Sequence, residues 1–138
     1  MSLTNNEKQL IKQSYTQITS ATSNFAAIFY DCLFELAPLI RPMFVNERNV
    51  FEQHFNEIIA TAVDKVNDFE TIEESLLQLG RIHRNFGVNI GQFKVVKNAL
   101  LLSIQYTLKQ QCNEEVEQAW SHYYDCIAAV MIRGLETE

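Results

Sequence analysis

Proline occurs at only two positions in this chain of 138 residues, Pro38 and Pro42, and both fall in one short corner. Because proline inside a helix removes a backbone hydrogen bond and clashes with the preceding turn, this confinement leaves most of the chain free to be helical. No stretch alternates apolar and polar residues for long enough to indicate a strand. The sequence therefore predicts one all-α domain, residues 1–138, with roughly six or seven helices.

Side chains that can cap a helix mark several helix starts. Three pairs place a capping residue three positions before its reciprocal partner: Thr4 and Glu7, Thr71 and Glu74, and Asn89 and Gln92. Asn113, followed by two glutamates, predicts a fourth start. Apolar residues recur at helical spacing after these starts and elsewhere, as in Phe25, Phe29, Leu33 and Leu36.

Composition and charge exclude several classes of protein. The chain is 47% hydrophobic and 20% charged, as expected for a soluble globular domain, and its net charge is −6. Its scattered lysines and arginines offer no basic stripe for nucleic acid or for an anionic membrane. It has neither a membrane-spanning segment nor a recognisable export signal, and Cys32, Cys112 and Cys126 suggest no disulfide framework. We expect a cytoplasmic protein, either a monomer or a weak homodimer.

One histidine stands where apolar residues are expected. His83 shares a helix face with Leu76, Leu79 and Phe86, just before Gly87. An imidazole that faces an apolar space near a helix end is suited to be an axial iron ligand. Two other interpretations remain open at this point. The ring can be a core histidine bonded to a backbone carbonyl, or a cation that stabilises the helix C-terminus.

Three parts of the chain resemble single-domain bacterial haemoglobins and the globin domain of flavohaemoglobins. The first runs from Leu79 to Val88 and continues through Phe93, Val96 and Ala99-Leu100-Leu101; the second is Ile28 to Phe34 with Pro38 and Met43-Phe44; the third is Ala119-Trp120 with Tyr124. These parts occur in family order, and the resemblance extends from about Leu3 to Ile132. It implies the globin fold, in which three helices cross over three others and enclose haem.

The resemblance also implies the cofactor and its contacts. The cofactor would be haem b, with His83 as the proximal iron ligand and Phe44 stacked on the porphyrin. Tyr30 corresponds to the distal tyrosine, which donates a hydrogen bond to a bound gas; dioxygen, carbon monoxide and nitric oxide are the expected ligands. Further expected haem contacts are Phe51, His54, Phe55, Val88, Phe93 and Val96.

The distal helix allows two registers. Counting back from His83 without gaps places Phe51 at the gate of the distal pocket and Phe55 above the iron, but leaves Asn56 on a face expected to be buried. A shift of one turn places His54 at the gate and Ile58 above the iron. We favour the ungapped register. His54 then remains open as a distal iron ligand, a partner for a haem propionate, or an exposed residue.

The proximal side departs from the nitric-oxide-detoxifying members of the family. Phe93 and Leu135 stand where a tyrosine and a glutamate would make the proximal imidazole more electron-donating. The resemblance therefore favours reversible oxygen binding, for transport or storage, over oxidative chemistry. One alternative is a nitric oxide dioxygenase that uses a separate reductase, since no reductase domain fits within this chain. Another is a haem-based gas sensor, which normally couples to an output domain.

Overall fold

The computed structural model describes residues 3–136, and the regular structure of this part of the chain is all helical, with no strand. Its elements, in order, are α1 (Asn5–Ala21), α2 (Phe25–Leu36), the 3₁₀ turn η1 (Pro38–Met43), α3 (Arg48–Asp64), η2 (Phe69–Ile72), α4 (Glu73–Asn85), α5 (Ile90–Leu108), η3 (Lys109–Gln111) and α6 (Glu114–Glu136). Both prolines lie in η1, which turns the chain between α2 and α3. The predicted all-α class is confirmed.

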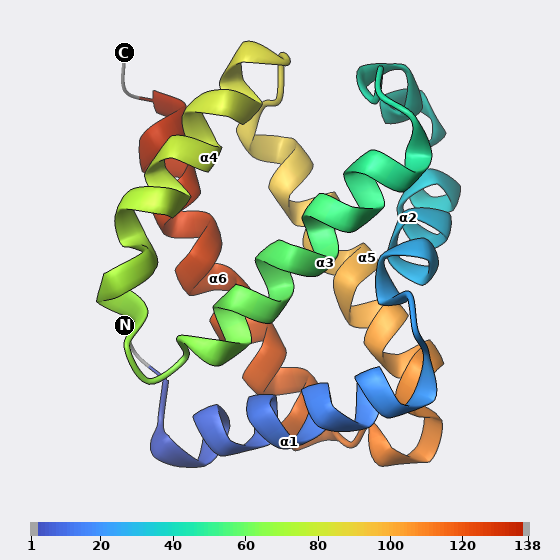
Figure 1. Cartoon of the computed structure of the whole chain (residues 1–138), viewed down its shortest axis with the longest axis vertical. Coiled ribbons are helices and arrows are strands. Elements are labelled where there is room, and N and C mark those ends of the chain that lie inside the picture. Colours follow the sequence, from blue (N-terminus) through green and yellow to red (C-terminus); the bar gives the residue numbers. More distant parts are fainter. Residues whose placement is uncertain (1–2, 137–138) are drawn as a thin grey trace.

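The helices form two crossed layers (Figure 1). In one layer α5 lies between α2 and α6 and contacts both. The helices α1, α3 and α4 cross over this layer, with α1 against α5 and α6, α3 against α2, and α4 across α6. The core between the layers consists of large buried side chains, among them Ile11, Ile18, Phe29, Leu33, Val66, Ile104 and Tyr123. No helix of the described residues is long and apolar enough to cross a membrane.

The capping pairs account for two of the three helix starts predicted from them. Thr4 with Glu7 and Asn89 with Gln92 form complete capping boxes at the starts of α1 and α5. A helix does begin beside the third pair, at Glu73, but Thr71 does not cap it, because its hydroxyl donates to the carbonyl of Asp68 at 2.7 Å and so belongs to η2. The fourth start is confirmed separately, since the Asn113 side chain accepts a hydrogen bond from the backbone N–H of Val116.

Polar side chains of α6 connect it to three other helices. The indole N–H of Trp120 donates to the hydroxyl of Ser14 on α1 at 2.8 Å, inside the core. The hydroxyl of Tyr124 donates to the carbonyl of Phe93 on α5 at 2.7 Å, and that of Tyr123 donates to a carbonyl on α3. These hydrogen bonds fix the position of α6, and α4 packs against α6.

Two glycines allow α4 to lie unusually close to α6. A Cβ atom added at Gly80 would be 2.0 Å from the carbonyl oxygen of Met131, and one added at Gly134 would be 2.1 Å from that of Leu77. Each position faces the backbone of the opposite helix, so no larger residue fits without separating the helices. This crossing determines where α4 holds His83, which follows Gly80 by one turn.

Candidate functional site

Six aromatic rings gather where α2, α3 and the end of η1 meet, with Tyr30 at their centre. The centroid of the Tyr30 ring lies 4.6 Å from that of Phe51, 4.9 Å from Phe29 and 5.5 Å from Phe44. Its remaining ring neighbours are Phe55 at 5.7 Å and Phe34 at 5.8 Å. We call Phe29, Tyr30, Phe34, Phe44, Phe51 and Phe55 the aromatic cluster. Most of the pairs are edge-to-face, the arrangement that aromatic quadrupoles favour.

The hydroxyl of Tyr30 is a hydrogen-bond donor without a partner. Tyr30 is 7% exposed, and its hydroxyl forms no hydrogen bond with any residue between positions 3 and 136. Burial raises the pKa of this phenol far above its usual range, and the Glu52 carboxylate raises it further. The phenol is therefore protonated at neutral pH. No fully enclosed side-chain oxygen or nitrogen among the described residues lacks a partner, so the Tyr30 hydroxyl retains contact with solvent, where a polar ligand atom can accept a hydrogen bond from it.

Asparagine side chains hold α3 against the start of α2. The Asn56 side-chain oxygen accepts a hydrogen bond from the backbone N–H of Ala26 at 3.1 Å, while its nitrogen donates to Asn24 at 2.9 Å. Asn24 makes no capping bond of its own, so Asn56 satisfies this end of α2 from the neighbouring helix. Asn56, which the ungapped register leaves on a buried face, thus has a hydrogen-bond partner for its side-chain oxygen and another for its side-chain nitrogen.

Arg48 forms the second connection between α2 and α3. Its guanidinium donates to Asp31 at 2.7 Å, to the carbonyl of Ala27 at 3.0 Å and to Glu52 at 2.6 Å. The hydrogen bond from Arg48 lowers the pKa of the Glu52 carboxyl, which remains charged at neutral pH. Glu52 also accepts from Asn24 at 3.0 Å. This network joins the start of α3 to α2, the two helices that carry Phe51 and Tyr30.

His83 is half-buried near the end of α4, and one of its ring nitrogens has a partner. Nδ1 lies 2.7 Å from the carbonyl oxygen of Leu79. Because a carbonyl can only accept, Nδ1 carries the proton, and in the neutral ring Nε2 then presents a lone pair. Nε2 contacts no donor among the described residues. This is the arrangement expected of a histidine that binds a metal through Nε2, with its ring oriented by a backbone carbonyl.

The face of α4 that carries His83 does not pack extensively against α2, α3 or α5. The main contacts of α4 are with α6 and η2. Large apolar side chains are exposed in the part of the chain around His83: Ile82 on α4, Phe86 at its end and Ile90 at the start of α5. A flat apolar group against these side chains would remove them from water, a favourable change of about 25 cal/mol per Å² buried.

The other predicted site residues are placed as follows. Phe44, Phe51 and Phe55 join Tyr30 in the aromatic cluster, while Val88 and Val96 are half-buried beside the core and Phe93 is buried. His54 is exposed on α3 and does not belong to the cluster. Leu135 is buried, as an apolar residue in that position requires. Between positions 3 and 136 no three His, Cys, Asp or Glu side chains group to hold a metal ion.

Sequence reasoning missed two rings and the polar network. Phe34 follows Tyr30 by four residues on α2, so helical spacing was a signal that it shares the site. Phe29 is stacked on Phe55 with ring centroids 4.2 Å apart, a contact between helices that spacing alone does not reveal. The bonds of Arg48 to α2 likewise have no local signature.

Comparison with known proteins decides the family. The sequence profile of the globin family matches residues 27–131, which include Tyr30, Phe44 and His83. The chain belongs to the globin family. Neuroglobin-1 of Oncorhynchus mykiss is 32% identical over 146 aligned residues, which cover 96% of this chain and 92% of that protein. Neuroglobin of Danio rerio is 29% identical over the same shares of the two chains.

Solved structures support the same fold. A bacterial globin from Campylobacter jejuni superimposes with a TM-score of 0.83 at 22% identity, covering 96% of both chains. An engineered carbene transferase derived from a putative nitric oxide dioxygenase of Rhodothermus marinus gives 0.84 at 21% identity, covering 94% of this chain and 91% of that one. A hexacoordinated heme protein from an anhydrobiotic tardigrade gives 0.82 at 19% identity, covering 99% and 97%. The predicted globin fold is confirmed.

Proposed function

We propose that this globin holds haem b through His83 and binds a diatomic gas reversibly on the side of Tyr30. The observation that supports the gas-binding role is the hydroxyl of the largely buried Tyr30 side chain, a donor with no partner among the described residues. Haem, when bound, supplies an iron with one coordination position open to a gas. Dioxygen, carbon monoxide and nitric oxide are the proposed ligands, and the cytoplasm is the proposed location.

Each residue of the site has a distinct part in this proposal. Nε2 of His83 would hold the iron, while the Leu79 carbonyl orients the ring through its Nδ1 proton. Phe44 would pack against the porphyrin, and the Phe51 and Phe55 rings, which contact the Tyr30 ring, would give the space beside it apolar walls. In that apolar setting Tyr30 donates a hydrogen bond to a partly anionic oxygen atom of dioxygen, which slows its escape.

The proximal side favours binding over oxidation. The Nδ1 partner of His83 is a neutral backbone carbonyl rather than a carboxylate, so the imidazole donates less electron density to iron. Phe93 and Leu135 are both buried and apolar, and they add no polar partner.

The second candidate is nitric oxide dioxygenation with a separate reductase, to which one structural neighbour, derived from a putative nitric oxide dioxygenase, draws attention. Adding nitric oxide to the oxygenated protein with a generic reductase distinguishes the two, because a carrier reacts once per haem and an enzyme turns over.

Optical spectroscopy tests the cofactor and its ligand. The purified protein is expected to show a Soret band, and the variant His83→Gly is expected to lose its normal ferrous spectrum and regain it with added imidazole. His122→Ala is the matched control, because His122 is an exposed histidine that contacts Glu7 on α1. A protein reconstituted with haem that shows no Soret band would refute the proposal, as would a His83→Gly spectrum identical to wild type.

The same spectra test His54. Because its side chain is exposed on α3, the variant His54→Ala is expected to leave the resting spectrum unchanged. A low-spin, six-coordinate ferrous spectrum that disappears only in His54→Ala would instead make His54 the distal ligand. That outcome would favour the shifted register of the distal helix over the ungapped one.

A further inference from the structure

Arg48 ties the first turn of α3 to the part of α2 that carries Tyr30. Its Nη2 donates to the Asp31 carboxylate at 2.7 Å and to the Ala27 carbonyl at 3.0 Å, and its Nε donates to Glu52 at 2.6 Å. Asp31 directly follows Tyr30 in α2, and Ala27 precedes Tyr30 by three residues. We call Arg48 and these three partners the Arg48 clamp, which joins α3 to α2 at the level of Tyr30.

The first half of α3 has little else to hold it in place. The buried residues of this helix are Ile59, Ala62 and Val63, and all three lie in its second half. The side chain of Glu47, the residue that precedes α3, makes no capping hydrogen bond with the helix. The position of the first half therefore depends on polar bonds to α2 and on the aromatic cluster, rather than on burial in the core.

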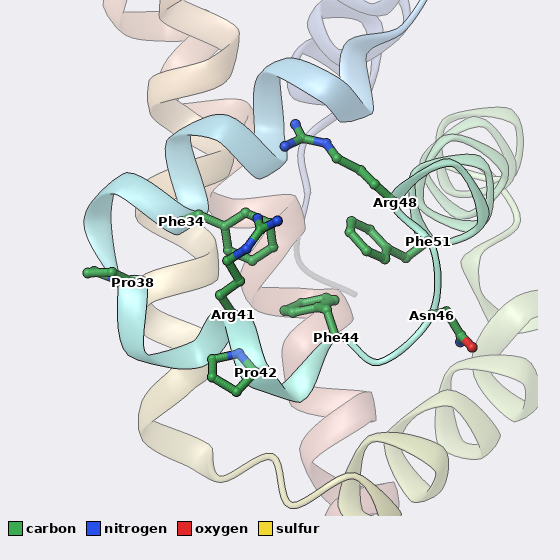
Figure 2. A pocket seen from close by; sticks show the side chains of 8 residues that line it. All are labelled: Phe34, Pro38, Arg41, Pro42, Phe44, Asn46, Arg48 and Phe51. Atoms are coloured by element: carbon green, nitrogen blue, oxygen red, sulfur yellow. The ribbon is translucent and has the colours of Figure 1, made fainter.

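The helix turn that carries Arg48 also carries the ring that lies against Tyr30. Phe51 follows Arg48 by three residues, so the two side chains occupy neighbouring positions on one helix. Figure 2 shows Arg48 reaching from α3 toward α2, with the Phe51 ring close by. The centroids of the Phe51 and Tyr30 rings are 4.6 Å apart, the shortest such distance that Tyr30 makes within the aromatic cluster. A movement of the first turn of α3 away from α2 would therefore carry Phe51 away from Tyr30.

We propose that Arg48 is a positioning residue that regulates how fast a gas enters and leaves the space beside Tyr30. This inference rests on the proposed function. While the Arg48 clamp is closed, Phe51 stays against Tyr30 and obstructs the passage. When its bonds break, the first half of α3 moves outward and a gas can pass in either direction. Because the same opening precedes entry and exit, the clamp changes both rates by one factor and leaves the gas affinity unchanged.

Carbon monoxide kinetics of the haem-loaded variant Arg48→Met test this inference. Methionine keeps a long apolar stem but donates no hydrogen bond. We expect association after flash photolysis and dissociation measured by displacement with nitric oxide to be faster by the same factor, about fivefold, a value discounted for the solvent exposure of Arg48 and Asp31. Arg48→Lys keeps the charge but lacks the planar fork, so it is expected to raise both rates by a smaller factor.

Two control variants separate positioning from a general loss of stability. Ser14→Ala removes the partner of the buried Trp120 indole, which joins α1 to α6, and so destabilises the protein away from the Arg48 clamp. Arg133→Met makes the same substitution as Arg48→Met at an exposed position of α6. Both controls are expected to keep the carbon monoxide rates of wild type.

Backbone hydrogen exchange tests the Arg48 clamp without any gas. In Arg48→Met the amides of residues 52–58 are expected to exchange faster than in wild type, while those of α6 keep their wild-type rates. This measurement can be made whether or not the protein holds haem. A failure of the proposed function, seen as a missing Soret band, is therefore distinguishable from a failure of the clamp.

Four results would overturn the inference. The carbon monoxide rates of Arg48→Met would equal those of wild type, or only its dissociation rate would rise, so that the affinity falls. Ser14→Ala would accelerate both rates as much as Arg48→Met does at an equal loss of Tm. Finally, hydrogen exchange in the first half of α3 would be the same in Arg48→Met and in wild type.

Discussion

The crossing of α4 and α6 gives a prediction whose size follows from the structure. The variant Gly80→Ala places a methyl group 2.0 Å from the carbonyl oxygen of Met131 and 2.9 Å from its carbon. Because favourable contacts lie near 3.5–4.0 Å, α4 must move away from α6 by roughly 1 Å or more. Such overpacking lowers the free energy of unfolding by about 1–3 kcal/mol, and the better helix propensity of alanine offsets up to about 1 kcal/mol of this loss. We expect a net loss of about 1–2 kcal/mol and a fall in Tm of about 3–8 °C.

Thermal unfolding followed by circular dichroism measures this loss. Gly91→Ala is the matched control, because a Cβ atom there meets only the Asn89 side chain, at 3.4 Å. It is expected to leave Tm unchanged or to raise it, since Gly91 is an exposed helical residue of α5. If Gly80→Ala were as stable as wild type, close packing of the two backbones would not be what holds α4 in place, and our account of the position of His83 would fail.

Three further predictions concern the distal side and the N-terminus. Tyr30→Phe is expected to speed dioxygen dissociation by about 10- to 100-fold in stopped-flow measurements, with little change in Tm because no bond within the protein is lost. Asn56→Ala is expected to destabilise the protein by about 1–2 kcal/mol in urea unfolding, because the backbone N–H of Ala26 loses its acceptor. For Glu7, the backbone N–H of Thr4 and the contact with His122 lower the pKa of the carboxyl, so its contribution to stability is present above about pH 4.5 and lost as the pH falls below it. Glu7→Gln is therefore expected to flatten the acid limb of a plot of urea midpoint against pH, and an unchanged limb would contradict this cause.

Much of the fold could be predicted from the sequence because its signals are local. Capping boxes at Thr4 and Asn89 are completed within four residues, and the confinement of both prolines to one corner is visible without any structure. The prediction at Thr71 failed because a competing local bond to Asp68 forms a 3₁₀ turn ahead of α4. A sequence pattern cannot show which of two nearby partners a hydroxyl selects.

The arrangement of α3 against α2 depends on contacts between residues that are distant in sequence. Asn56 looked misplaced because its partners lie 30 and 32 residues away, on the preceding helix. The bond of Arg48 to Asp31, 17 residues away, has no periodic signature either. The interpretation of His83 as a histidine bonded to a backbone carbonyl and its interpretation as an iron ligand turned out to be compatible, since the carbonyl engages only one ring nitrogen. The spacing of residues in the sequence could place the His83 ring on one face of its helix. It could not show which of the two ring nitrogens bonds to the carbonyl.

Under the proposed function, the aromatic cluster has a consequence for how diatomic gases would be distinguished. Phenylalanine and tyrosine side chains each rotate about only two bonds, so six packed rings lose little conformational entropy when a ligand arrives beside them. Binding of a ligand then costs little free energy for ordering these aromatic side chains. Small molecules of similar size fit against the rings about equally well. Discrimination between them is left to polarity, because only a ligand that can accept a hydrogen bond gains from the Tyr30 hydroxyl.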